Sequence, residues 1–290
     1  MIYRVTHTTQ YNYEEAVSQC LNEVRVTPRE LPTQRVKEHA IDVKPEPASF
    51  SRRVDYFGNS VTAFAVFEKH TRLETVARSV VEVARPKQAG NGASSWEQAR
   101  DLLATEASGP ALEALEFVFD SPFIPTGPAL AEYARPTFKP ERPLLEALQE
   151  LNHRIHTEFR YEPKSTSIEM PLLTVLENRR GVCQDFAHVM IGALRSMRLA
   201  ARYVSGYLRS GAGFQGAQAS HAWVSAYIPE MGWRDFDPTN NVMPSDGHIT
   251  LAWGRDYGDV TPVKGIALGG GGQSVEVAVV VHPDESFQAS

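Results

Sequence analysis

The chain has little cysteine and no long apolar run. Its 290 residues include two cysteines, Cys20 and Cys183, which lie in regions predicted to belong to different domains. A disulfide between them is not expected, so both are predicted to be free thiols, as in a reducing compartment. The sequence also lacks a membrane-spanning apolar run and a signal-peptide pattern after Met1. These absences favour a cytoplasmic protein without a membrane partner.

The chain also lacks an excess of positive charge. The net charge is −6 and the pI is near 5.9, so a nucleic-acid partner is not expected. The sequence contains no acidic Ca²⁺ loop and no complete set of metal-ligand spacings. The glycines at 269–272 lack the Lys-Ser/Thr of a phosphate loop. We therefore predict that the protein uses no metal and no cofactor.

Three regions follow one another along the chain. Residues 1–85 contain short β-type runs separated by turn signals, which predict a domain resembling a β-sandwich. Residues 86–142 contain short helical patterns and several prolines, and we interpret them as a connection. Residues 143–290 are predicted to form an α+β core, in which one helix packs on an antiparallel sheet. The β-type runs of the first region are 2–9, 20–27, 36–43, 50–56, 61–69 and 73–83.

Cys183 lies between a glycine turn and a helical pattern. Gly181 precedes it, and apolar residues at helical spacing follow it to about residue 198. Free N–H groups and the positive dipole at a helix start stabilise a thiolate. By itself, a cysteine before a helix is most often a small buried apolar residue. Cys183 is nevertheless a candidate nucleophile because its possible partners follow downstream.

Two neighbouring strands are predicted to carry those partners. Residues 219–228 and 232–236 have strand patterns and are separated by a short turn. His221 lies on the first strand, and Asp235 and Asp237 lie on or just after the second. An aspartate that accepts from one imidazole nitrogen leaves the other nitrogen facing the sulfur. We prefer Asp237 to Asp235, because Asp237 ends its strand, where a loop can close over a site.

Several motifs resemble one known superfamily. Their residues are Gly181-Val182-Cys183-Gln184-Asp185-Phe186-Ala187, His221-Ala222-Trp223 and Trp233-x-x-x-Asp237-Pro238-Thr239. They resemble the transglutaminase-like superfamily, which shares the papain-like cysteine fold. Residues 3–13 and 22–25 resemble the N-terminal region of bacterial transglutaminase-like proteins, and residues 248–260 resemble their C-terminal part. The resemblance implies a Cys183–His221–Asp237 catalytic triad on a papain-like core.

The resemblance also implies a reaction and its helpers. Cys183 would attack an amide or peptide carbonyl of a peptide or protein substrate and form a thioester. Water as acceptor would make the protein a hydrolase such as a cysteine protease or amidase, and an amine would make it a transglutaminase. Candidate oxyanion or substrate contacts are Tyr161, Gln184 and Trp223. For Tyr161 alone, a packed aromatic side chain is the more common interpretation.

Two further alternatives stay open from the sequence. Arg255 and Asp256 could form a polar wall near the site or a structural ion-pair cluster. The protein could also be a non-catalytic binding or scaffold protein on the same fold, whose N-terminal domain recognises a partner. A scaffold has no need of all three residues Cys183, His221 and Asp237, so the sequence favours the enzyme.

Overall fold

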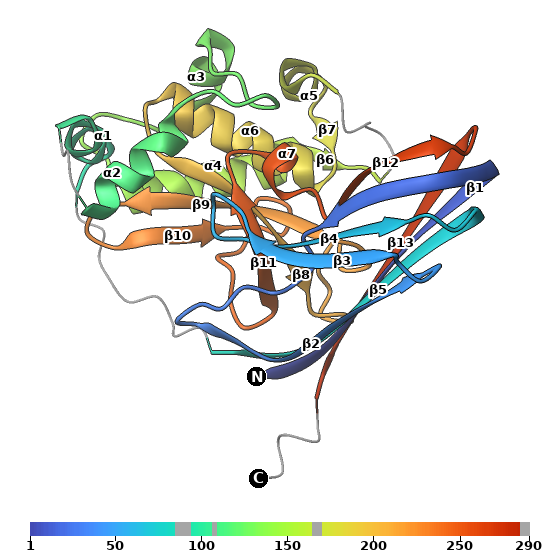
Figure 1. Ribbon diagram of the computed structural model, residues 1–290. Helices are drawn as coiled ribbons and strands as arrows, with labels where there is room; N and C mark the ends of the chain where they lie inside the picture. The colour runs from blue at the N-terminus through green and yellow to red at the C-terminus, as the bar shows by residue number, and fades with distance from the viewer. Residues whose placement is uncertain (85–93, 106–108, 164–169, 285–290) are drawn as a thin grey trace.

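The computed structural model describes residues 1–84, 94–105, 109–163 and 170–284. It consists of an N-terminal antiparallel sheet, a smaller antiparallel sheet and a group of helices (Figure 1). The predicted α+β class is therefore confirmed. Within the described ranges, no helix has both the length and the apolar character to cross a membrane.

The N-terminal sheet is built around one long strand, β1 (Ile2–Val24). Where the sequence predicts two short strands, the chain continues through residues 13–16 without leaving the sheet, although the pairing is interrupted there. The other strands are β2 (Gln34–Lys44), β3 (Ser49–Val54), β4 (Ser60–Val66), β5 (His70–Val83), β12 (Val263–Gly269) and β13 (Gln273–Pro283). Several strands contribute to one apolar cluster, which includes Val17 of β1, Phe64 of β4 and Leu73 of β5.

The last two of these strands correct the predicted domain boundary. Residues 143–290 are predicted to form the core, but β12 and β13 pair with β1 in the N-terminal sheet. Tyr3 lies opposite Pro283, and Val24 lies opposite Val263. This pairing joins residues that are far apart in the sequence. A division of the chain into consecutive segments therefore assigns β12 and β13 to the wrong domain.

The core contains helices on one side of a four-stranded sheet with the order β10-β9-β8-β11 (Figure 1). Its strands are β8 (Ala201–Leu208), β9 (His221–Ile228), β10 (Gly232–Phe236) and β11 (His248–Gly254). The short elements β6 (Arg160–Tyr161) and β7 (Arg180–Gly181) pair in parallel. The helices are α1 (Trp96–Thr105), α2 (Gly109–Leu115), η1 (Glu116–Val118), α3 (Pro128–Ala134), α4 (Leu144–Glu158), α5 (Leu172–Asn178), α6 (Cys183–Ser196) and α7 (Tyr257–Val260).

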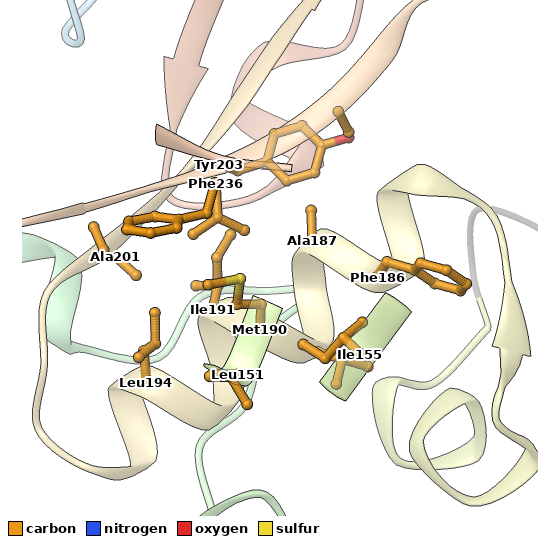
Figure 2. Close-up of a cluster of buried hydrophobic side chains, with 14 of the residues drawn as sticks. Leu151, Ile155, Phe186, Ala187, Met190, Ile191, Leu194, Ala201, Tyr203 and Phe236 are labelled. Atoms are coloured by element: carbon orange, nitrogen blue, oxygen red, sulfur yellow. The ribbon is translucent and has the colours of Figure 1, made fainter. Parts of the chain in front are cut away.

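Helix α6 lies at the centre of the core. Its residues from 185 to 195 are all buried, as expected of a helix that is covered on every side. Figure 2 shows Met190 and Ile191 of α6 among Leu151 of α4 and Ala201 and Phe236 of the sheet. Burial of this many apolar side chains holds the first turn of α6 in a fixed position relative to strand β9.

Side-chain amides from the N-terminal sheet cover the outer edge of β11. Gln34 donates to the Thr250 carbonyl and accepts from the Thr250 N–H, both at 2.8 Å. Asn59 makes the same pair of hydrogen bonds with Trp253, at 2.9 and 3.0 Å. Each amide therefore takes the place of a neighbouring strand, and an edge satisfied in this way does not recruit another chain.

Candidate active site

Cys183 is the first residue of α6, as predicted. The Asp185 side chain folds back and accepts from the Val182 N–H at 2.8 Å. A Cβ on Gly181 would lie 2.5 Å from an Asp185 carboxylate oxygen, so this turn requires glycine. The Cys183 thiol is partly exposed, and its own N–H has no acceptor within the helix. The sequence Gly-x-Cys-x-Asp thus presents both a thiol and an N–H at one helix start.

His221 and Asp237 lie side by side at the ends of neighbouring strands. The Nε2 of His221 is 2.9 Å from an Asp237 oxygen, and both side chains are fully buried. His221 begins β9, and Asp237 follows β10 directly. The alternative aspartate, Asp235, lies opposite Ser225, farther along β9. The structure therefore brings His221 together with Asp237.

The electrostatics of this pair favour a charged imidazole. Burial alone would lower the pKa of His221, but the negative charges of Asp237 and then of Cys183 raise it to about 10. Burial would raise the pKa of Asp237, but His221 and then His248 hold it well below its usual range. Because Nε2 is bonded to Asp237, Nδ1 is the nitrogen left for Cys183; it is buried and, among the described residues, has no hydrogen-bond partner of its own. The group as a whole suits a thiolate facing an imidazolium.

Two further residues, which the sequence does not predict, contact the same carboxylate. His248, at the start of β11, places its Nε2 3.2 Å from the oxygen that His221 contacts. The Asn240 side chain donates to that oxygen at 2.8 Å. The other Asp237 oxygen accepts from the N–H groups of Thr239 and Asn240, at 3.0 and 3.1 Å. Asn240 follows Asp237-Pro238-Thr239 directly, but nothing local in the sequence connects it or His248 with Asp237.

Cys183 and His221 open into a cavity of about 680 Å³. Tyr161 and Gln184, two of the predicted contact residues, also line it. Burial, followed by the charges of Cys183 and Asp237, raises the pKa of Tyr161 to about 12, so its hydroxyl remains a donor at neutral pH. The opposite wall comes from the N-terminal sheet, through His7, Thr9, Tyr11, Val263, Lys264, Val275 and Val277.

Trp223 is not a contact residue, contrary to our prediction. Its side chain is fully buried and does not line the cavity. A Cβ on Gly206 would lie 2.2 Å from the Trp223 ring, so the indole fills space that this glycine leaves. Its ring packs edge-on against His248 at a centroid distance of 5.4 Å. Trp223 therefore supports the residues behind the cavity.

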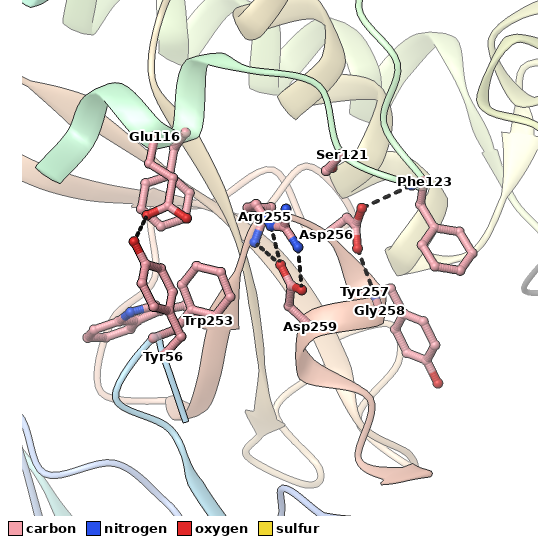
Figure 3. A network of polar contacts seen from close by, with 12 residues as sticks. Tyr56, Glu116, Ser121, Phe123, Trp253, Arg255, Asp256, Tyr257, Gly258 and Asp259 are labelled. Atoms are coloured by element: carbon pink, nitrogen blue, oxygen red, sulfur yellow. Dashed lines mark hydrogen bonds and ion pairs between the residues drawn. The ribbon is translucent and has the colours of Figure 1, made fainter. Parts of the chain in front are cut away.

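Arg255 and Asp256 do not line the cavity, so of the two alternatives the contacts support the structural ion-pair cluster and not the polar wall. Figure 3 shows Arg255 paired with Asp259, at 2.9 Å. Asp256 begins α7 and accepts from the N–H groups of Gly258 and Phe123, both at 2.9 Å. These contacts form a structural cluster, and it positions the adjacent Tyr257, which does line the cavity.

Gly216 in the loop before β9 gives a first test of this geometry. A Cβ there would lie 2.8 Å from Nδ1 of His221. We expect Gly216→Ala to displace the imidazole and to slow alkylation of Cys183 by roughly tenfold, about one pKa unit of lost interaction. The rate constant is measured from the intact mass after iodoacetamide treatment.

Gly213 is the matched control. Both glycines have a positive φ, +79° at Gly213 and +86° at Gly216, so alanine is strained at either position. A Cβ on Gly213 would contact nothing within 4 Å. Equal slowing in Gly213→Ala and Gly216→Ala would mean that loop strain, and not the His221 contact, determines the rate.

Comparison with known proteins agrees with this architecture. Residues 3–82 match the bacterial transglutaminase-like N-terminal region, and residues 131–238 match the transglutaminase-like superfamily. An uncharacterized protein of Mycobacterium tuberculosis is 38% identical over 98% of this chain and 93% of its own length. A protein-glutamine gamma-glutamyltransferase of Pseudomonas aeruginosa is 30% identical over 134 residues, which are 41% of this chain and 19% of that protein.

A solved structure has the same fold. It belongs to a candidate cysteine protease of Cytophaga hutchinsonii and superposes with a TM-score of 0.77 at 19% identity, covering 97% of this chain and 90% of that one. The matches to the N-terminal region and to the core thus agree with the two sheets described above. The chain belongs to the bacterial transglutaminase-like proteins, within the transglutaminase-like superfamily.

Proposed function

We propose that this protein is a cysteine-dependent hydrolase of amide or peptide bonds that works through a thioester, without a cofactor. One observation carries the proposal. His221 shares a cavity with Cys183 while its Nε2 is bonded to a buried Asp237. This arrangement matches a nucleophile, a proton carrier and a group that orients the carrier.

The chemistry follows from those three side chains. The Cys183 thiolate attacks the carbonyl carbon, and the C–O π electrons move onto oxygen. The tetrahedral species collapses, the C–N bond breaks, and His221 Nδ1 gives its proton to the leaving amine. Water then attacks the thioester while His221 takes a proton from it, and the acid and the free thiolate are released. If an amine attacked in place of water, a new amide would form. The name of the Pseudomonas relative, a protein-glutamine gamma-glutamyltransferase, describes an acyl transfer of this kind.

Two donors are proposed to stabilise the oxyanion. The first is the N–H of Cys183 at the start of α6, where the helix dipole adds positive potential. The second is the Tyr161 hydroxyl, which stays protonated at neutral pH because the pKa of Tyr161 is raised to about 12. Gln184, the second residue of α6, lines the same cavity and is proposed to contact the substrate.

Selective alkylation tests the proposal. We expect iodoacetamide at pH 6–7 to modify Cys183 well before Cys20. Cys20 is buried, and this burial raises the pKa of its thiol. Because the pKa of His221 is raised to about 10, its positive charge beside Cys183 persists between pH 6 and 9, and Cys183 should stay ahead of Cys20 across this range. In His221→Asn this positive charge is absent, so labelling of Cys183 should be slower than in the parent at pH 6–7, and the difference should shrink as the pH rises.

The same experiment can contradict the proposal. Slow and equal labelling of both cysteines, or a pH profile that His221→Asn leaves unchanged, would favour a non-catalytic binding protein. A mixture of peptide amides, followed by mass analysis for an acyl adduct on Cys183, then identifies the bond that is attacked. Added amines show whether water or an amine accepts the acyl group.

A further inference from the structure

Strand β13 forms an outer edge of the N-terminal sheet beside the cavity. Part of this edge is covered by the loop before β9. The Val279 N–H donates to the Gln218 carbonyl at 3.0 Å, and the Val281 carbonyl accepts from the Ser210 N–H at 3.0 Å. In an antiparallel strand, the N–H and C=O of one residue point to the same side, and those of its neighbours point to the other. The odd-numbered residues of β13 therefore direct their backbone groups to this outer edge.

Val275 and Val277 continue the outer edge without a cover. Among the described residues, their N–H and C=O groups have no partner on that side. Their side chains are 48% and 43% exposed and line the same cavity as Cys183. Proteins usually cover or charge an open apolar edge, because it can recruit other chains. The edge of β11 is covered by two amides, whereas this stretch of β13 is open at the cavity.

We propose that Val275 and Val277 bind the substrate as an added strand. An extended polypeptide segment would pair with the open edge and bring a carbonyl to Cys183. This inference rests on the proposed function. A row of alternating N–H and C=O groups is matched by the backbone of an extended peptide, and alternate side chains of that peptide would enter the cavity.

The loop before β9 limits the length of the added strand. Gln218 already occupies the edge at Val279, so the added strand can extend no farther in that direction. The same loop continues through Ser220, which lines the cavity, to His221. One end of the bound segment would therefore lie beside the loop that leads to His221. The substrate class that fits is an extended region of a polypeptide, not a small isolated amide.

Proline substitution tests this mode of binding. The N–H of Val277 points away from β1, so Val277→Pro removes a group of the open edge and keeps the ladder to β1. The probe is a mixture of acetylated pentapeptidyl acyloxymethyl ketones with randomised side chains. We expect it to label Cys183 at least tenfold faster than a one-residue analogue. Val277→Pro should reduce this rate by about tenfold, the loss expected for one or two backbone hydrogen bonds.

Two controls separate binding from folding. Gln273→Pro changes another odd-numbered residue of β13 that does not line the cavity, and its rate should equal that of the parent. Labelling by iodoacetamide should stay within twofold of the parent in Gln273→Pro. In Val277→Pro the peptide rate is divided by the iodoacetamide rate of the same variant, so that a change in thiol reactivity is separated from a loss of peptide binding. If Val277→Pro does not fold, a backbone N-methylated form of the pentapeptidyl probe replaces the variant, because it cannot donate to the edge. It should label the parent no faster than the one-residue analogue.

Each outcome decides between the two proposals. If iodoacetamide labels Cys183 but the pentapeptidyl probe gains nothing over its one-residue analogue, the added strand is wrong and the proposed function stands. The added strand is also wrong if the pentapeptidyl probe is faster than its one-residue analogue by the same factor in the parent and in Val277→Pro, or if the N-methylated probe keeps that factor. If neither reagent labels Cys183 in the parent, the proposed function fails, and the added strand fails with it.

Discussion

Replacing Cys183 with alanine is expected to abolish rapid labelling by iodoacetamide, acyl adducts and all turnover, while the melting temperature stays close to that of the parent. The sulfur is the only heavy atom removed, and the partly exposed Cys183 side chain lines the cavity. The loss of apolar burial is therefore small. The measurements are intact mass after treatment with iodoacetamide or peptide amides, together with thermal unfolding followed by circular dichroism.

Cys20→Ala should behave in the opposite way. Cys20 is 2% exposed, packs in the apolar cluster of the N-terminal sheet and accepts from the Asn22 side chain at 3.2 Å. Removing its sulfur should lower the melting temperature and leave labelling of Cys183 unchanged. An adduct that persists in Cys183→Ala and disappears in Cys20→Ala would show that the wrong thiol has been assigned.

The second large effect is expected from Asp237→Asn. The amide cannot hold a positive charge on His221, and its NH₂ group would face imidazole nitrogens that now donate to Asp237. Covalent trapping of Cys183 should slow by at least about tenfold, and turnover by on the order of 10⁴, as for the same change in serine protease triads. Trapping is measured with iodoacetamide, so it needs no identified substrate.

Stability needs its own control, because Asp237 is buried and accepts several hydrogen bonds. Asp55→Asn is matched to it. Asp55 accepts from the N–H groups of Phe57 and Asn59 and from Arg25, and it does not line the cavity. Both variants should melt below the parent, but only Asp237→Asn should slow trapping. Equal trapping rates in the two variants would give Asp237 a purely structural role.

The stability difference between the parent and Asp237→Asn should also depend on pH. The raised pKa of His221 means that its protonated form stabilises the fold fully below pH 6.5, and this contribution disappears as the pH rises to about 10. The lowered pKa of Asp237 means that its carboxylate contributes above about pH 3.8 and loses this contribution as the pH falls further. The difference should therefore be largest between about pH 4 and 6.5, as measured by chemical denaturation across that range.

The local parts of this fold could be predicted from the sequence. Helix α6 begins at Cys183 because a glycine turn precedes a run of apolar residues at helical spacing. The strands that carry His221 and precede Asp237 follow from alternation and a short turn. The non-local parts could not. No local pattern shows that Val279 lies opposite His7, or that Gln34 hydrogen-bonds to Thr250.

The same division applies to the residues of the site. Gln184 follows Cys183 directly, and Tyr161 comes just after helix α4. Both residues line the cavity. His248 and Val277 reach the site through strand pairing, so their isolated sequence contexts contain no signal. Trp223 shares a strand with His221, but the space left by Gly206 places its ring in the interior. The place of a large side chain such as Trp223 therefore depends on the space left by a small residue on the neighbouring strand, which the local sequence does not show.

The distance along the chain between β1 and its last partners sets an order of events during synthesis. β1 to β5 leave the ribosome first, but the second neighbour of β1 is not available until residues 263–283 have been made. Until then one edge of β1 is unpaired, and pairing across so long a loop is slow. Val275 and Val277, which line the cavity, are made after every strand and helix of the core. Cys183 is thus synthesised before the strand that completes the cavity around it.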